Sequence, residues 1–251
     1  MKRVLTLGMM VFAIGVFLLG TSPPAHAVAT LGLYDGVTAV TCADGAACDA
    51  AGGAGSVSWT TSIGAFTLTV TVGVSNSPGG GTSLVDMVYI VSSAGPGSVS
   101  LFFSDTGFTS PASPPDVGFD NRIDGNQTAA GTTRFRSYLS TTVPNVLFGQ
   151  TVADYSGAGC TFCVSDVGAT KLADSGAVAS PINFGATTPA NAPAPYALTI
   201  QVDVTHSTTQ VSSGDAFIQG AVPEPASLLL LGSGLAGLGL WGRRRFAKKN
   251  I

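Results

Sequence analysis

Apolar and polar residues alternate strictly along several short segments of the chain. Residues 66–74 (FTLTVTVGV) place an apolar residue at every second position, with threonine between them as far as residue 71. Residues 198–205 (LTIQVDVT) repeat this alternation, and residues 98–103 (SVSLFF) begin with it. Because successive side chains of a β-strand point to opposite faces, each segment is predicted to be a strand with one buried face.

Weaker versions of the pattern predict further strands at 31–40, 56–61, 84–92, 132–142 and 214–220. Segments rich in Gly, Pro, Asn and Asp are predicted to be turns, namely 77–81, 95–97, 111–115 and 124–126. Residues 181–195 (PINFGATTPANAPAP) are expected to form a long surface connection. Strands with one apolar face bury it against a second sheet. The predicted fold is therefore all-β, a two-sheet β-sandwich with Greek-key or jelly-roll-like connections.

The N-terminal end departs from this pattern. Two basic residues precede an uninterrupted apolar stretch at 4–20, and Ala25 and Ala27 then form an A-x-A site. A charged start, an apolar stretch and a small-residue cleavage site are the three parts of a secretory signal peptide. Residues 1–27 are therefore predicted to be a signal helix that is cleaved from an exported domain at 28–221.

The C-terminal end is also distinct. Residues 226–241 carry no charge, and Arg243, Arg244 and Arg245 follow almost immediately. Such a run is long enough for a single transmembrane helix when its flanks are included, and the basic tail stays in the cytoplasm. Pro223, Glu224 and Pro225 stand just before it, and Glu224 is the only glutamate in the chain.

The order of these three parts within 222–251 resembles the PEP-CTERM sorting signal of Gram-negative bacteria. The resemblance implies recognition by exosortase, an integral-membrane enzyme with a cysteine nucleophile. It further implies a transient stay in the inner membrane and then transfer to the cell surface or the extracellular matrix. The alternating body is similar to uncharacterised β-rich proteins that carry the same signal.

The exported domain is strongly acidic. It contains all thirteen aspartates of the chain and four basic residues, Arg122, Arg134, Arg136 and Lys171. Nucleic-acid binding requires clustered lysine and arginine, so it is not predicted. Only 10% of the chain is charged, against the usual ~25%, so hydroxyl groups and aspartates must make up most of the polar surface.

All four cysteines lie in the exported domain. Because export leads to an oxidising compartment, two local disulfides are predicted, Cys42–Cys48 and Cys160–Cys163. The C-x-x-C spacing of the second pair also occurs at redox sites, and four cysteines also suit zinc. These two readings remain as alternatives.

Candidate catalytic residues are scarce. His206 is the only histidine of the exported domain, and it is expected to be a partly exposed residue at a strand end. The exported domain contains no nucleophile elbow and no nucleotide-binding glycine motif. We therefore predict no catalytic residues, no cofactor and no enzymatic activity.

One acidic cluster merits consideration as a calcium site. Asp116, Asp120 and Asp124 lie close together in the segment DVGFDNRIDGN. As a calcium loop the segment is poor, because Arg122 occupies a ligand position and no glutamate follows. A solvated turn is the favoured interpretation, and no metal site is predicted.

These observations favour a non-enzymatic protein of the cell surface or extracellular matrix of the kind found in biofilms. The alternative is an extracellular carbohydrate-binding module, with or without calcium, that binds exopolysaccharide. Its candidate stacking residues are Trp59 and the tyrosines at 34, 89, 138, 155 and 196. Trp59 alternates with Val57 and Thr61, which favours a place in the core.

Processing at both ends is a direct test of the sequence interpretation. Mass spectrometry of the secreted protein is expected to show an N-terminus at Val28 and loss of the apolar run at 226–241. Recovery of an intact chain that remains in the inner membrane would contradict this expectation.

Overall fold

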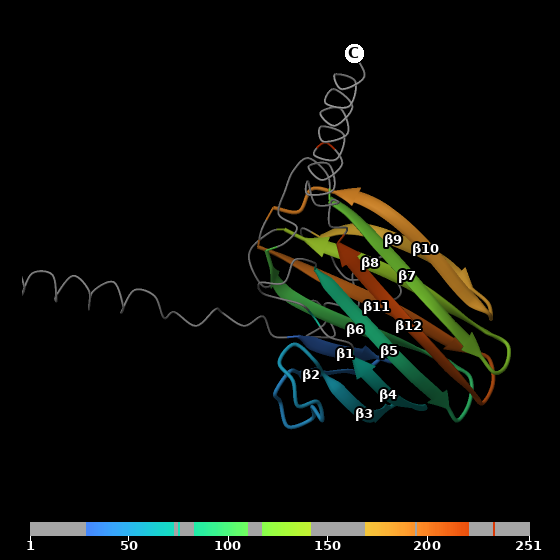
Figure 1. Cartoon of the computed structure of the whole chain (residues 1–251). Coiled ribbons are helices and arrows are strands. Elements are labelled where there is room, and N and C mark those ends of the chain that lie inside the picture. Colours follow the sequence, from blue (N-terminus) through green and yellow to red (C-terminus); the bar gives the residue numbers. More distant parts are fainter. Residues whose placement is uncertain are drawn as a thin grey trace, which may run out of the picture.

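The structure is a computed structural model that describes residues 29–72, 75, 83–109, 117–141, 169–193, 195–220 and 233. These residues contain twelve β-strands arranged in two antiparallel sheets of six. The sheets face each other as two layers (Figure 1). The predicted all-β sandwich is therefore confirmed, whereas the predicted signal and transmembrane helices lie outside the described residues.

Neighbouring strands follow a fixed order in each sheet. Sheet A consists of β2 (Ala39–Ala43), β1 (Thr30–Tyr34), β6 (Gly97–Phe108), β11 (Tyr196–His206), β8 (Gly131–Ser140) and β9 (Ala169–Val178). Sheet B consists of β10 (Ile182–Ala190), β7 (Val117–Gln127), β12 (Gln210–Gly220), β5 (Leu84–Ser93), β4 (Phe66–Val72) and β3 (Ser58–Ile63).

The last eight strands pair in a nested order. β5 pairs with β12, β6 with β11, β7 with β10, and β8 with β9. This is a long folded hairpin rolled over two sheets, which is the jelly-roll arrangement. The hairpin β1–β2 extends sheet A beside β6, and the hairpin β3–β4 extends sheet B beside β5.

The core lies between the sheets and consists of the inward residue of each alternating pair. Leu198, Ile200, Val202 and Val204 of β11 are all fully buried, as the alternation predicts. Large side chains from both sheets fill the same layer, including Phe103, Phe135, Leu68, Met87, Tyr89 and Phe119. Trp59 packs partly buried against this core, in agreement with the sequence prediction.

The single strand predicted at 31–40 is in fact a hairpin. β1 ends at Tyr34 and β2 begins at Ala39. Asp35 accepts the backbone N–H groups of Val37 and Thr38 at 2.9 and 2.7 Å, and Gly36 has φ of 96°. An Asp-Gly turn of this kind was hidden by apolar residues on both sides of it.

Two predicted loops are strands. The turn expected at 124–126 lies inside β7, where a Cβ on Gly125 would collide with the carbonyl oxygen of Ser213 on β12. Glycine is required there for close approach of two backbones and does not mark a turn. The connection expected at 181–195 contains β10, an edge strand, and such a strand tolerates Pro189. β9 was not predicted either.

Sheet A is buried on its outer face as well. Tyr34, Phe102 and Tyr138 form a second apolar cluster there. Arg136 makes a buried ion pair with Asp203, whose other oxygen accepts hydrogen bonds from Ser100 and Gln201 at 2.7 and 2.8 Å. A buried ion pair is tolerated only when the remaining polar atoms are also satisfied, and this network meets much of that need.

His206 is buried, so the expectation of a partly exposed residue is wrong. It is the last residue of β11, where the same inward alternation that buries Val204 also buries its ring. Nδ1 lies 2.7 Å from the hydroxyl of Ser93, and Nε2 lies 2.7 Å from that of Ser212. Neutral imidazole has one donor and one acceptor, which suits two hydroxyls.

Protonation of His206 is expected to destabilise the fold. Burial lowers the pKa of His206 below its usual 6.5, so below pH 6.5 the unfolded chain binds a proton that the folded chain does not. The free energy of unfolding should therefore fall on acidification. Denaturant unfolding of the wild type and His206→Gln at pH 8 and pH 5.5 measures this, and the stability advantage of the wild type should shrink at pH 5.5. An equal difference at both pH values would contradict the assignment.

Candidate binding surface on the outer face of sheet B

The outer face of sheet B, in contrast to that of sheet A, is exposed to solvent. Outward residues of four strands align in rows across it. One row contains Asp86, Phe217, Arg122 and Gly185, and the next contains Val88, Asp215, Asp124 and Asn183. We call this surface the sheet B face.

Arg122 occupies the middle of the sheet B face. Its Nε and Nη2 lie 3.2 and 3.1 Å from the two carboxylate oxygens of Asp120. Its guanidinium also lies 5.9 Å from the centre of the Phe217 ring on β12. Its side chain remains 55% exposed, so the cation is held in position and still accessible to a ligand.

A hollow of about 360 Å³ opens beside Arg122, over the paired strands β7 and β10. It is lined by Asp120, Arg122, Asp124, Asn183, Phe184, Gly185, Ala186 and Thr187. Gly185 stands opposite Arg122 in the register, and a Cβ there would lie 3.7 Å from Arg122 Cγ. The absence of a side chain at Gly185 thus contributes to the depth of the hollow.

A pair of carboxylates lies on the next two strands. Burial, a hydrogen bond to Asp215 and the charge of Asp215 together raise the pKa of Asp86 to about 6. Beyond this pair the face becomes apolar, with Val88, Ile90 and Val211 exposed by 39, 48 and 40%.

The predicted acidic cluster is only partly assembled here. Asp120 and Asp124 both point outward from β7, with Arg122 between them, and Asp116 lies outside the described residues. The segment is a strand, so the expected solvated turn is wrong. Within the described ranges no group of three or more His, Cys, Asp or Glu is placed to hold a metal ion.

The aromatic residues considered for sugar stacking lie elsewhere. Tyr34, Tyr89, Tyr138 and Tyr196 are buried, and Tyr155 lies outside the described residues. An aromatic residue that does lie on this surface is Phe217, which was not among the predicted stacking residues. The alternation of Ala216 and Ile218 on the inward face was the signal that placed Phe217 outward.

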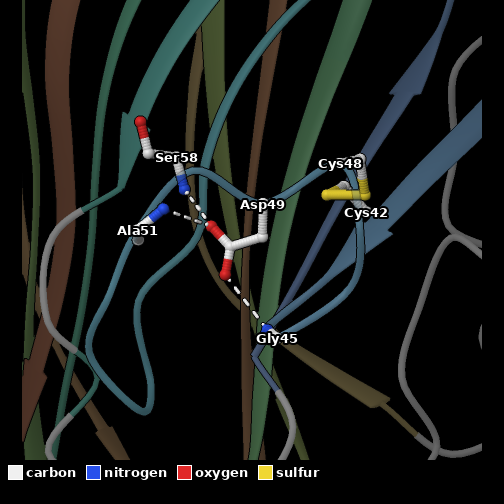
Figure 2. The surroundings of a disulfide bond; sticks show 6 residues. All are labelled: Cys42, Gly45, Cys48, Asp49, Ala51 and Ser58. Carbon is white, nitrogen blue, oxygen red and sulfur yellow. Dashed lines mark hydrogen bonds between the residues drawn. A yellow bond between two sulfur atoms is a disulfide. The ribbon is translucent and has the colours of Figure 1, made fainter.

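The predicted disulfide Cys42–Cys48 is present, and Cys160 and Cys163 lie outside the described residues. Figure 2 shows the loop that follows it, where Asp49 accepts the N–H groups of Gly45, Ala51 and Ser58 at 2.8–3.0 Å. Burial raises the pKa of Asp49, but these three hydrogen bonds outweigh it and bring the pKa below its usual value. Covalent and hydrogen-bonded links together fix the connection between β2 and β3.

The residues of the expected processing sites are outside the described part of the chain. They are Ala25, Ala27, Pro223, Glu224, Pro225, Arg243, Arg244 and Arg245. The family profile of the PEP-CTERM protein-sorting motif matches residues 221–245. The chain carries a PEP-CTERM sorting motif. The motif implies an exported protein that is processed by exosortase and reaches the cell surface or the extracellular space.

This PEP-CTERM protein was also compared with curated proteins and with solved structures. No curated protein matches the chain. A solved structure of TmCBM61 in complex with beta-1,4-galactotriose is similar over 61% of this chain and 86% of that chain, with 9% identity and a TM-score of 0.30. A likeness at this level supports no conclusion about the function. In the described residues no helix is long and apolar enough to cross a membrane.

The carboxylate pair predicts a gain in stability from removal of one charge. The pKa of Asp86 is raised to about 6 in the folded protein, from its usual 3.8. The stabilisation of the folded state by protonation of Asp86 is therefore complete below pH 4 and is lost as the pH rises through 6. Asp86→Asn should therefore raise the melting temperature at pH 7.5 and change it little at pH 4.

The matched control is Asp174→Asn. Hydrogen bonds from Arg134, stronger than the opposing effect of burial, keep the pKa of Asp174 well below its usual range. This variant should lower the melting temperature at pH 7.5. An Asp86→Asn effect that is the same at both pH values would show that charge is not its cause.

Proposed function

We propose that this PEP-CTERM protein is a non-enzymatic protein of the cell surface or extracellular matrix and that the sheet B face is its interaction surface. The observation that supports this most is the asymmetry of the sandwich. The outer face of sheet A is buried, whereas the face formed by β5, β7, β10 and β12 is open and carries a hollow. An exported domain with one open face is suited to binding a partner through that face.

The chemistry of the hollow favours a neutral, hydroxyl-rich ligand over an anion. Asp120 and Asp124 accept hydrogen bonds, Asn183 both donates and accepts, and Arg122 donates. Nucleic acid would meet these two carboxylates, and it therefore remains outside the proposal.

A second candidate function is carbohydrate binding, and the position of Phe217 next to Arg122, which lines the hollow, favours it. A sugar has a C–H face that packs on an aromatic ring and hydroxyls that bond to polar side chains at its edge. Phe217 and Arg122 offer the two kinds of contact within one row of the sheet. Exopolysaccharide around the cell is the matching partner for an exported protein.

In this proposal the two terminal segments determine the route of export. The signal peptide at 1–27 directs the chain out of the cytoplasm, and the segment at 222–251 holds it in the inner membrane until exosortase processes it. The β-sandwich then reaches the surface or the matrix with the sheet B face free.

A glycan array and polysaccharide pull-down with the full-length chain test the second candidate. Arg122→Ala is expected to weaken polysaccharide binding at least tenfold, because one good charged hydrogen-bonding group contributes about that much. Arg134→Ala is the matched control, since Arg134 also pairs with one aspartate, at 2.7 Å, but from sheet A. It should leave binding unchanged.

The other outcomes are equally informative. Absence of any glycan binding would reject carbohydrate and leave a protein partner for the sheet B face. Release of products from a polysaccharide would refute the non-enzymatic role.

A further inference from the structure

Two aspartates flank the start of β1 at one end of the sandwich. Thr30 of β1 pairs with Ala43 on one side and with Ser104 on the other. Asp44 and Asp105 each stand one residue beyond those partners, and the N–H of Asp44 donates to the carbonyl of Ala29 at 2.8 Å. Both therefore lie beside Ala29, whose side chain is a single methyl group.

Both carboxylates belong to the inward face. Leu31, Cys42 and Phe103 form one row of buried side chains across the same three strands. Residues two apart on a strand lie on the same face, so the next inward row across these strands consists of Ala29, Asp44 and Asp105. With strands about 4.8 Å apart, the two aspartate Cα atoms are about 10 Å apart, a gap that two side chains and one ion can span.

Asp105 is buried without a counter-charge. It is 1% exposed, and its Oδ1 accepts the N–H of the next residue, Thr106, at 2.7 Å. In the ranges that the structure describes, no arginine, lysine or histidine pairs with it. Burying a carboxylate in this way is costly unless it binds a proton or a cation.

Asp44 is held by a hydrogen bond from Gly55, a residue that also bonds to the backbone of Ser75. Its Oδ2 accepts the N–H of Gly55 at 2.6 Å, and the carbonyl of Gly55 accepts the N–H of Ser75 at 3.1 Å. Ser75 is 4% exposed, and its hydroxyl has no hydrogen-bond partner. A buried hydroxyl without a partner is uncommon and requires an explanation. A cation bound beside Asp44 would give this hydroxyl a partner.

We infer that Asp44 and Asp105 bind one divalent cation of the calcium type, with the Ser75 hydroxyl as a further ligand. Carboxylate and hydroxyl oxygens suit a hard cation, and calcium accepts irregular sets of oxygen ligands more readily than magnesium does. This site is separate from the sheet B face and holds together β1, β2, β6 and the segment around Gly55. Its role is to stabilise that end of the sandwich outside the cell.

A proton is the competing occupant. Burial, with a contribution from the charge of Asp44, raises the pKa of Asp105 to about 7. Without a cation the group would thus be largely protonated in mildly acidic conditions and only partly ionised near neutrality. The two occupants make different predictions about calcium.

Thermal unfolding and calorimetric titration of the full-length chain at pH 7.5, in 1 mM calcium chloride or in chelator, distinguish them. Calcium should raise the melting temperature of the wild type, because a ligand that binds the folded state stabilises it. This shift should disappear in Asp105→Asn and Asp44→Asn, and Ser75→Ala should weaken calcium binding at least threefold. Magnesium should produce a smaller shift.

Asp124→Asn is the control, since it removes a carboxylate from the sheet B face, and it should retain the full calcium shift. If Asp105→Asn does not fold, Asp44→Asn answers the question, because Asp44 is only partly buried. A wild-type melting temperature that is the same in calcium and chelator would overturn the inference. A calcium shift that survives in Asp44→Asn, or that is lost in Asp124→Asn instead, would also overturn it.

Discussion

The close packing of β5, β12 and β7 in sheet B depends on the residues that lie opposite Tyr89. Tyr89 projects from β5 into the core and is fully buried. Gly214 of β12 stands opposite it and pairs in turn with Gly125 of β7. A Cβ on Gly214 would overlap the Tyr89 hydroxyl, and a Cβ on Gly125 would overlap the β12 backbone. Gly214 thus makes room for the Tyr89 side chain, and Gly125 allows β7 to approach the backbone of β12.

The two outer faces of the sandwich differ in burial and in chemistry. In sheet A most outer residues of β6, β8 and β11 are buried, and Arg136 and Asp203 neutralise each other there. In sheet B the outer residues are exposed or half-buried, and strands β7 and β12 bring Asp120, Arg122 and Phe217 together from segments distant in the sequence. Polar side chains are therefore accessible to a partner on sheet B, whereas those on the outer face of sheet A stabilise the fold.

The sequence was sufficient for the fold class and for the strands with a clean period of two. Burial of Phe66 and Leu68 in β4, burial of the inward residues of β11 and the Cys42–Cys48 disulfide were predicted correctly. β7 and β10 were not, because Gly125 and Pro189 normally indicate turns, and only the partner strands show why they fit here. The sheet B face was also beyond prediction, since register across four strands decides which side chains meet.

The exported domain has fewer basic residues than aspartates, so several aspartates have no basic partner in the described residues. All four basic residues of the exported domain are engaged, Arg122 with Asp120, Arg136 with Asp203, and Arg134 and Lys171 with Asp174. Asp49 is satisfied by backbone N–H groups instead. Asp86 and Asp105 receive no basic partner, and burial raises the pKa of both. Asp86 is half-buried, whereas Asp105 is fully enclosed. Because all four basic side chains are already paired, Asp105 must bind a cation from the surroundings or retain a proton.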